Sequence, residues 1–167
     1  MSPQQFHIAT QPYRDKLFRF AFHLLGKRED AEETLQDVML RLWEKRQQWN
    51  QIDNHDAYFM RMIRNAAIDR MRKRKLQTEP VETQYHIQDR ELDPHQQLSA
   101  QEGYQRIINL MHDLPAAHRD VIYLREVEGY SYDEIAHHLD LTLDQVKTNL
   151  FRARRKMREL LLKNDAL

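Results

Sequence analysis

The sequence predicts an all-helical protein with two small domains, and three observations support this prediction. Glycine is rare, at three of 167 residues, and runs of β-branched residues are few, so strands are disfavoured. Apolar residues recur at helical spacing before residue 76 and again after residue 99. The segment between them has no such period. We therefore predict one domain over residues 1–75, a linker over residues 76–99 and a second domain over residues 100–167.

Composition excludes several classes of protein. The 26 Lys and Arg residues balance 26 Asp and Glu residues, but the charges are unevenly spread, so the net charge says little about partners. Cysteine is absent, which rules out disulfides and cysteine zinc sites and fits a reducing compartment. No run of about 18 apolar residues occurs, and the N-terminus lacks the apolar stretch of a secretory signal. We expect a cytoplasmic protein.

The first domain is expected to contain three helices. The first ends at Gly26, the usual C′ position for glycine, and its apolar face consists of Tyr13, Leu17, Phe20, Ala21 and Leu24. The second begins near Asp30, with acids in its first turn where the helix dipole favours them. Its buried stripe consists of Leu35, Val38, Met39 and Leu42. Asn54 or Asp56 caps the third helix, whose expected inward face is Phe59, Met62, Ile63 and Ala66.

The third helix carries a strong positive charge. From Arg61 to Lys75 there are seven Lys and Arg residues and one acid, Asp69, a net charge of +6. Its second side consists of Arg61, Arg64, Asn65, Ile68 and Arg72. Tyr58 and Phe59 precede this side and could stack on unpaired bases, although their spacing also fits ordinary core residues. The charge predicts a contact with nucleic acid.

Residues 76–99 are predicted to form a flexible acidic linker. Pro80 and Pro94 interrupt the segment, which contains several Asp and Glu residues but only one Lys or Arg residue, Arg90. The second domain then opens with a helix whose apolar face is Tyr104, Ile107, Ile108 and Met111. Pro115 stands in the first turn of the next helix, in which Val121, Leu124 and Val127 point inward before Gly129.

A helix-turn-helix follows. Ser131 with Glu134, and Thr142 with Gln145, form two capping boxes that start helices eleven residues apart. The turn falls at residues 139–141. Apolar side chains clamp the two helices together; they are Ile135, Ala136 and Leu139 on the first and Val146 and Leu150 on the second. A motif of this spacing places its second helix in the DNA major groove.

The second of these helices is predicted to recognise DNA. One side carries Val146, Leu150, Ala153 and Met157, and the opposite side carries Asp144, Thr148, Phe151, Arg152 and Arg155. Candidate base readers are Gln145, Lys147, Thr148 and Arg152. Phe151 could meet a thymine methyl group or a sugar. Candidate phosphate contacts are Arg154, Arg155, Lys156 and Arg158. The alternative is a solvated basic end that the helix dipole favours.

Neither a metal site nor a catalytic site is expected. Glu134 and His137, followed by His138, match the Glu-x-x-His pattern of di-iron bundles, but that architecture needs a second copy and two further glutamates. We therefore predict no metal, no cofactor, no small-molecule substrate and no enzymatic activity.

Together these stretches resemble the sigma-70 family, and specifically the extracytoplasmic-function (ECF) sigma factors of bacterial RNA polymerase. REDAEETLQDVMLRLWEKRQQW resembles regions 2.1–2.2, and AYFMRMIRNAAIDRMRKRK resembles regions 2.3–2.4. LPAAHRDVIYLREVEGYSYDEIAHHLDLTLDQVKTNLFRARRKMREL resembles region 4. The ECF group lacks region 3, which fits two halves joined only by an acidic linker.

The resemblance implies a role for each half in transcription initiation. The first would bind the clamp helices of the largest polymerase subunit through Glu33, Gln36, Asp37, Arg41 and Trp43. Its third helix would recognise and melt the minus-10 element through Arg61, Arg64, Asn65, Asp69, Arg72, Lys73 and Arg74, with a flipped base beside Asp69. The second half would bind the minus-35 element through Gln145, Lys147, Thr148, Phe151, Arg152, Arg154, Arg155 and Lys156, with Arg125 as a contact to the DNA backbone.

The same resemblance implies partners. They are core RNA polymerase, through its clamp helices and flap, promoter DNA, and an anti-sigma factor, which in this family is often anchored in a membrane. The linker would thread the basic RNA exit path of the polymerase. The rival interpretation is a helix-turn-helix transcriptional regulator whose first half senses a signal or dimerises, but such a bundle does not need the arginine side from Arg61 to Arg72.

Overall fold

The computed structural model of the chain describes residues 1–77 and 94–165. Every regular element in these residues is a helix, which confirms the predicted all-α class. The described residues divide into two compact units: residues 1–77 belong to the first and residues 94–165 to the second. None of the described helices combines the length and the apolar character that a bilayer crossing needs.

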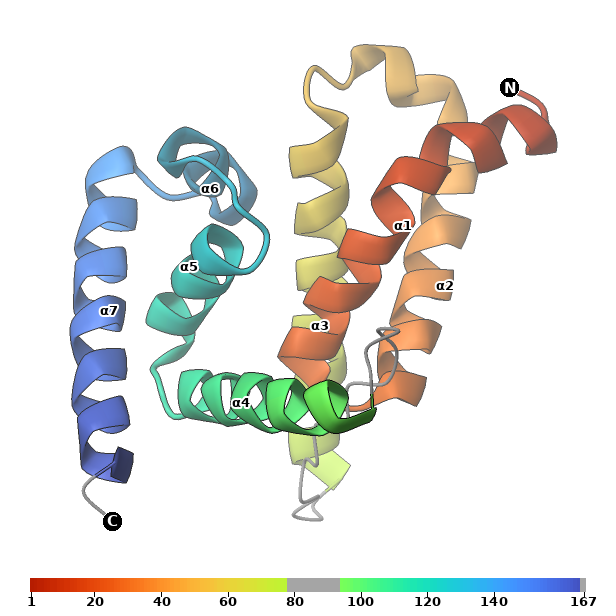
Figure 1. Ribbon diagram of the computed structural model, residues 1–167. Coiled ribbons are helices and arrows are strands. Elements are labelled where there is room, and N and C mark those ends of the chain that lie inside the picture. Colours follow the sequence, from red (N-terminus) through yellow and green to blue (C-terminus); the bar gives the residue numbers. More distant parts are fainter. Residues whose placement is uncertain (78–93, 166–167) are drawn as a thin grey trace. The chain divides into compact units, whose positions relative to one another are not determined.

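The first unit is a three-helix bundle with a short 3₁₀ turn (Figure 1). Its elements are α1 (Pro3–Leu25), α2 (Arg28–Glu44), η1 (Arg46–Gln51) and α3 (His55–Gln77). Helices α1, α2 and α3 each pack against the other two. The core residues include Leu17, Phe20, Val38, Leu42, Phe59 and Ile63. The predicted stop at Gly26 is confirmed, because its φ of 74° lies in the left-handed region that ends helices.

Helix α1 begins at Pro3, whereas the apolar period predicted a start at Tyr13. A capping box begins it: the Gln5 N–H donates to Ser2 Oγ at 3.2 Å, and the Ser2 N–H donates to Gln5 Oε1 at 2.8 Å. The added turns are held by Phe6, which is buried with its ring 5.3 Å from Trp43 and 5.4 Å from Trp49. This aromatic packing outweighs the helix-breaking tendency of Pro12.

The inward face of α3 differs from the predicted one. Met60 and Ala67 are buried, whereas Met62 and Ala66 are only half-buried. The reason is that α3 packs against both α1 and α2, which broadens and turns its buried stripe. Phe59 is fully buried and belongs to the core. Of the two candidate caps, Asn54 acts, because its Oδ1 accepts the Ala57 N–H at 3.0 Å.

Both ends of the predicted linker, residues 76–99, are helical. Helix α3 continues to Gln77, and α4 (Pro94–His112) begins at Pro94, a residue favoured in the first turn of a helix. Residues 78–93 lie outside the described residues, so the linker remains a prediction there.

The second unit contains α4, α5 (Ala116–Glu126), α6 (Tyr132–Leu139) and α7 (Leu143–Asp165). Helix α7 packs against α4, α5 and α6 (Figure 1). The core residues include Ile108, Met111, Val121, Leu124, Ile135 and Leu150. The predicted apolar face of α4 is only partly buried: Ile108 and Met111 are buried, while Tyr104 and Ile107 are exposed. Leu110, which lies outside that face, is also buried. Pro115 is the N-cap of α5 rather than part of its first turn.

The predicted helix-turn-helix is present as α6 and α7. Asp140, with a φ of 54°, turns the chain, and the Leu141 N–H donates to the Ala136 carbonyl at 2.9 Å. The capping box of α7 is complete, with the Gln145 N–H on Thr142 Oγ1 at 3.1 Å and the Thr142 N–H on Gln145 Oε1 at 2.9 Å. At the start of α6, Ser131 Oγ accepts the Glu134 N–H at 3.1 Å.

Candidate nucleic-acid interface

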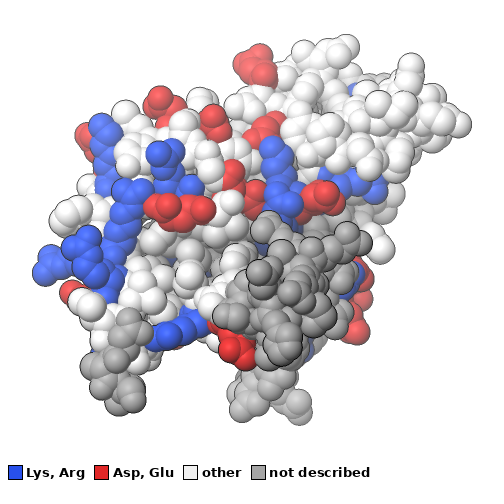
Figure 2. Space-filling model, viewed as in Figure 1, with Lys and Arg blue, Asp and Glu red and all other residues white. Residues whose placement is uncertain are grey.

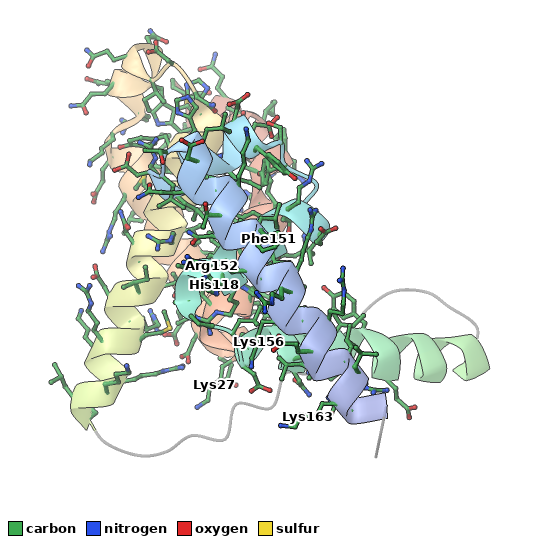
Figure 3. The ribbon with its side chains drawn as sticks, turned by 90° about the vertical axis from the view of Figure 1, so that its left-hand side faces the viewer. Lys27, His118, Phe151, Arg152, Lys156 and Lys163 are labelled. Carbon is green, nitrogen blue, oxygen red and sulfur yellow. The ribbon has the colours of Figure 1, made fainter. Side chains whose placement is uncertain are left out.

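The outer side of α7 is the strongest candidate for a DNA-binding surface. Val146, Leu150, Ala153 and Met157 are buried, as predicted, so the opposite side faces solvent. Phe151 is 68% exposed there, which is a large apolar exposure for a helix of a small domain. Phe151, Arg152 and Lys156 follow one another along the side of α7 that faces the viewer in Figure 3. The other candidate readers, Gln145, Lys147 and Thr148, are also exposed.

Positive charge gathers on the same helix. Figure 2 shows Lys and Arg side chains over α7, and the predicted phosphate contacts Arg154, Arg155, Lys156 and Arg158 are all exposed. Arg155 and Lys156 each lie 3.7 Å from a Glu159 carboxylate oxygen, a weak surface pairing. This concentration of positive charge would attract a polyanion to this face of α7.

Two of the predicted minus-35 residues also serve the fold. Arg154 donates to Glu126 of α5, and that hydrogen bond raises the pKa of Arg154. Arg125 donates from Nη1 to the Tyr130 carbonyl at 2.8 Å, and its guanidinium lies 5.0 Å from the Tyr132 ring centroid. Arg125 therefore holds the connection between α5 and α6, and its contact with a DNA backbone remains a prediction.

The predicted minus-10 residues all lie on α3, but they do not all face the same way. Asn65, Asp69, Arg72 and Lys73 are exposed, whereas Arg61, Arg64 and Arg74 are half-buried. Arg74 donates to the Leu25 carbonyl at 3.4 Å and forms an ion pair with Asp30 of α2. The end of α3 is thus tied to its own bundle through Arg74, while Arg72 and Lys73 point to solvent.

The predicted polymerase-binding residues lie along α2. Glu33, Gln36, Asp37 and Arg41 are exposed. Trp43 is half-buried, with its ring edge-on to Phe6 and the Arg46 guanidinium 3.9 Å from its centroid. Trp43 therefore contributes to the aromatic cluster of the bundle as well as to its surface.

Three residues that the sequence patterns did not indicate belong to these surfaces. Leu40 is 59% exposed on α2, within a turn of Asp37 and Arg41. Arg70 of α3 reaches Glu33 and Asp37, and Glu126 holds Arg154. Spacing could have indicated Arg70. The acids at positions 30, 33 and 37 lie along one side of α2, and the bases at positions 70 and 74 lie along one side of α3.

No metal-binding geometry is found among the described residues, since no three His, Asp or Glu side chains converge there. His138, part of the Glu-x-x-His pattern, is buried. Its Nδ1 contacts the Glu134 carbonyl oxygen, and its ring lies 4.3 Å from that of Tyr130. The contacts of His138 within the described residues are therefore packing contacts.

Comparisons with known proteins agree on one family for both units. The model of sigma-70 region 2 matches residues 10–77, and the model of sigma-70 region 4 matches residues 104–157. The chain is 25% identical over 159 residues to the ECF RNA polymerase sigma factor SigE of Mycolicibacterium smegmatis, covering 94% of this chain and 62% of that protein. It is 25% identical over 162 residues to the ECF RNA polymerase sigma factor SigX of Bacillus subtilis, covering 93% and 83%.

Two solved structures are similar to the chain. The sigma factor RpoE in complex with the anti-sigma factor NepR, from Bartonella quintana, has a TM-score of 0.75 and 25% sequence identity, covering 95% of this chain and 97% of that chain. CnrH in complex with the cytosolic domain of CnrY has a TM-score of 0.68 and 20% identity, covering 96% and 89%. The second likeness shows the fold.

Proposed function

The chain belongs to the sigma-70 family, as its sequence motifs predicted, and from this premise we propose that it is an ECF-type sigma factor. It binds core RNA polymerase and directs initiation at specific promoters. It acts in the cytoplasm, where polymerase and DNA are, and it carries out no chemical reaction itself. The polymerase supplies the catalysis.

One observation carries this proposal. The two compact units match sigma-70 region 2 and region 4 in that order, and each presents a basic helix, α3 in the first and α7 in the second. A helix-turn-helix regulator would explain α7 but not the region 2 match or the basic α3. We therefore do not favour the regulator.

The two units divide promoter recognition between them. Helix α7 reads the minus-35 element as duplex, with Lys147, Thr148, Phe151 and Arg152 at the bases and the later cations at phosphates. Helix α3 captures the opened minus-10 strand through its exposed polar side, where Asn65 and Arg72 lie. Two separated contacts on one promoter fix both the position and the direction of the polymerase.

Helix α2 supplies the contact with polymerase. Its exposed side includes Glu29, Glu32, Glu33, Asp37 and Glu44, which outnumber the exposed bases Arg28 and Arg41. An acidic side of this kind complements a basic partner, as the clamp helices are in this family, and such complementarity speeds association and selects the partner. Leu40 adds an apolar contact in the middle of the charged residues.

An anti-sigma factor is the partner expected to control the free protein. The similar Bartonella quintana sigma factor RpoE is in complex with the anti-sigma factor NepR, which supports a partner of this class here.

Reconstitution tests the proposal. Purified core RNA polymerase is incubated with fragments of genomic DNA, with and without the chain, and the transcript starts are sequenced. We expect defined start sites that share sequence elements near positions −10 and −35 and that appear only when the chain is added. Starts that are unchanged by the chain, or that change only when another sigma factor is present, would contradict the proposal.

A further inference from the structure

The basic residues of α3 divide into two groups that have different neighbours. Arg70 and Arg74 point at α2, whereas Arg72 and Lys73 are exposed. The Arg70 guanidinium bridges two acids of α2: Nη1 donates to Glu33 Oε2 at 2.7 Å, and Nη2 donates to Asp37 Oδ2 at 3.4 Å. Nη1 also lies 3.8 Å from Asp30 Oδ1. One planar cation therefore connects two acids one helical turn apart.

The exposed fractions of the three side chains show that Arg70 lies beneath the Glu33 and Asp37 carboxylates. The side chain of Arg70 is 25% exposed, whereas those of Glu33 and Asp37 are 63% and 60% exposed. Arg70 therefore approaches the carboxylates from the bundle and leaves their outer sides open. A carboxylate has about four lone-pair sites, so each acid can accept from Arg70 and from an outside partner together.

We propose that Arg70 is a positioning residue for polymerase binding: it orders the Glu33 and Asp37 carboxylates that α2 presents to core RNA polymerase, although it lies in the DNA-binding helix. This inference rests on the proposed function. Long surface side chains lose rotamer freedom when they bind, and a contact that restricts them beforehand lowers that cost. The Asp30–Arg74 pair beside it keeps α2 and α3 joined when Arg70 is changed.

The direction of the effect separates positioning from plain charge. Replacing Arg70 with alanine removes a cation from beside an acidic surface. If net charge alone mattered, a basic partner would then bind more tightly. If Arg70 orders the two carboxylates, the same partner binds more weakly.

A double-mutant cycle in the full chain tests the proposal. The dissociation constant for core RNA polymerase is measured for the wild type, for Arg70→Ala, for Glu33→Gln/Asp37→Asn and for the combined variant. We expect Arg70→Ala to weaken binding roughly fivefold in the wild-type background and to have no effect when both acids are already neutral. Arg70→Lys, which keeps the charge but reaches only one carboxylate, should fall in between.

Two controls separate this effect from a general loss of positive charge and from misfolding. Arg72→Ala removes the same charge two positions away, and it should weaken promoter binding while sparing polymerase binding. Both tryptophans, Trp43 and Trp49, lie in the first unit, so their fluorescence reports whether that unit is folded in each variant. Should Arg70→Ala fail to fold, the cycle is repeated with Arg70→Lys.

Each outcome decides the matter. Unchanged or tighter polymerase binding by Arg70→Ala overturns the inference. So does an equal loss in both backgrounds, because Arg70 would then act through the fold or by direct contact. If the wild-type chain does not bind polymerase, both the proposed function and this inference are wrong. If the wild-type chain binds polymerase and Arg70→Ala binds equally well, only this inference is wrong.

Discussion

Arg154 of α7 donates two hydrogen bonds to one carboxylate oxygen of Glu126 on α5, from Nε at 3.1 Å and from Nη2 at 2.7 Å. The two residues are 28 positions apart in the sequence. The pair therefore joins the predicted recognition helix to the helix that supports it. Both side chains remain nearly half exposed, at 46% and 48%, so solvent screens the interaction.

The Arg154 pair gives the first prediction. Arg154→Ala and Arg155→Ala each remove one cation from α7, but only the first also breaks the link to α5. We expect Arg154→Ala to lower the free energy of unfolding by up to about 1 kcal/mol more than Arg155→Ala. Urea unfolding followed by far-ultraviolet circular dichroism measures the difference, and equal stabilities would show that the pair contributes nothing.

The second prediction separates base readers from phosphate contacts. Arg152→Ala should cost about 1–3 kcal/mol and relax the preference at one base pair, whereas Arg155→Ala should weaken binding to all sequences alike. Arg152 lies in the N-terminal half of α7, the half with which recognition helices read bases, and Arg155 lies further along the helix. Binding of the reconstituted polymerase to a set of single-base promoter variants measures both. An equal loss on every sequence for both variants would contradict this division.

The third prediction concerns the side of α2 that we propose binds polymerase. Leu40→Ser and Asp37→Asn should weaken binding to core polymerase and leave the stability of the first unit unchanged, because both side chains are largely exposed. Trp43→Ala should weaken binding too, but it should also lower stability, since Trp43 packs against Phe6.

The controls for this surface are direct. Binding of each variant to duplex containing only the minus-35 element should match that of the wild type, because α7 belongs to the other unit. Loss of minus-35 binding without loss of polymerase binding would count against the assignment of α2.

The fourth prediction is a pH dependence of stability. Burial, together with the positive charge of Arg119, lowers the pKa of His112 to about 4, whereas an unfolded histidine has a pKa of about 6.5. The unfolded chain therefore binds this proton first as the pH falls. The stabilisation is complete above about pH 6.5 and is lost as the pH falls towards about 4.

Urea unfolding at pH 7.5 and at pH 5 measures this dependence. The loss of stability on acidification should be roughly 1–2 kcal/mol smaller for His112→Gln than for the wild type. His137→Gln, at an exposed position on α6, serves as the matched control and should behave as the wild type does. If His112→Gln lost as much stability as the wild type, His112 would not be the group responsible.

Local patterns predicted much of the fold. The capping box of Thr142 and Gln145, the stripe from Val146 to Met157 and the stop at Gly26 all depend on residues within a few turns of one another. The failures occurred where a distant contact intervened. Phe6 extends α1 past Pro12 because Trp43 and Trp49 cover it, and α3 buries Met60 rather than Met62 because it packs against two helices.

The candidate site divides in the same way. Amino-acid order alone established two basic helices, one acidic helix and their assignment to a family, because charge and periodicity repeat along a single helix. It did not reveal which arginines form ion pairs with acids on a neighbouring helix. Arg70 meets Glu33 across 37 positions of the chain, and Arg154 meets Glu126 across 28. Those pairings arise because folding brings separate helices to within hydrogen-bond distance, and no local period encodes that distance.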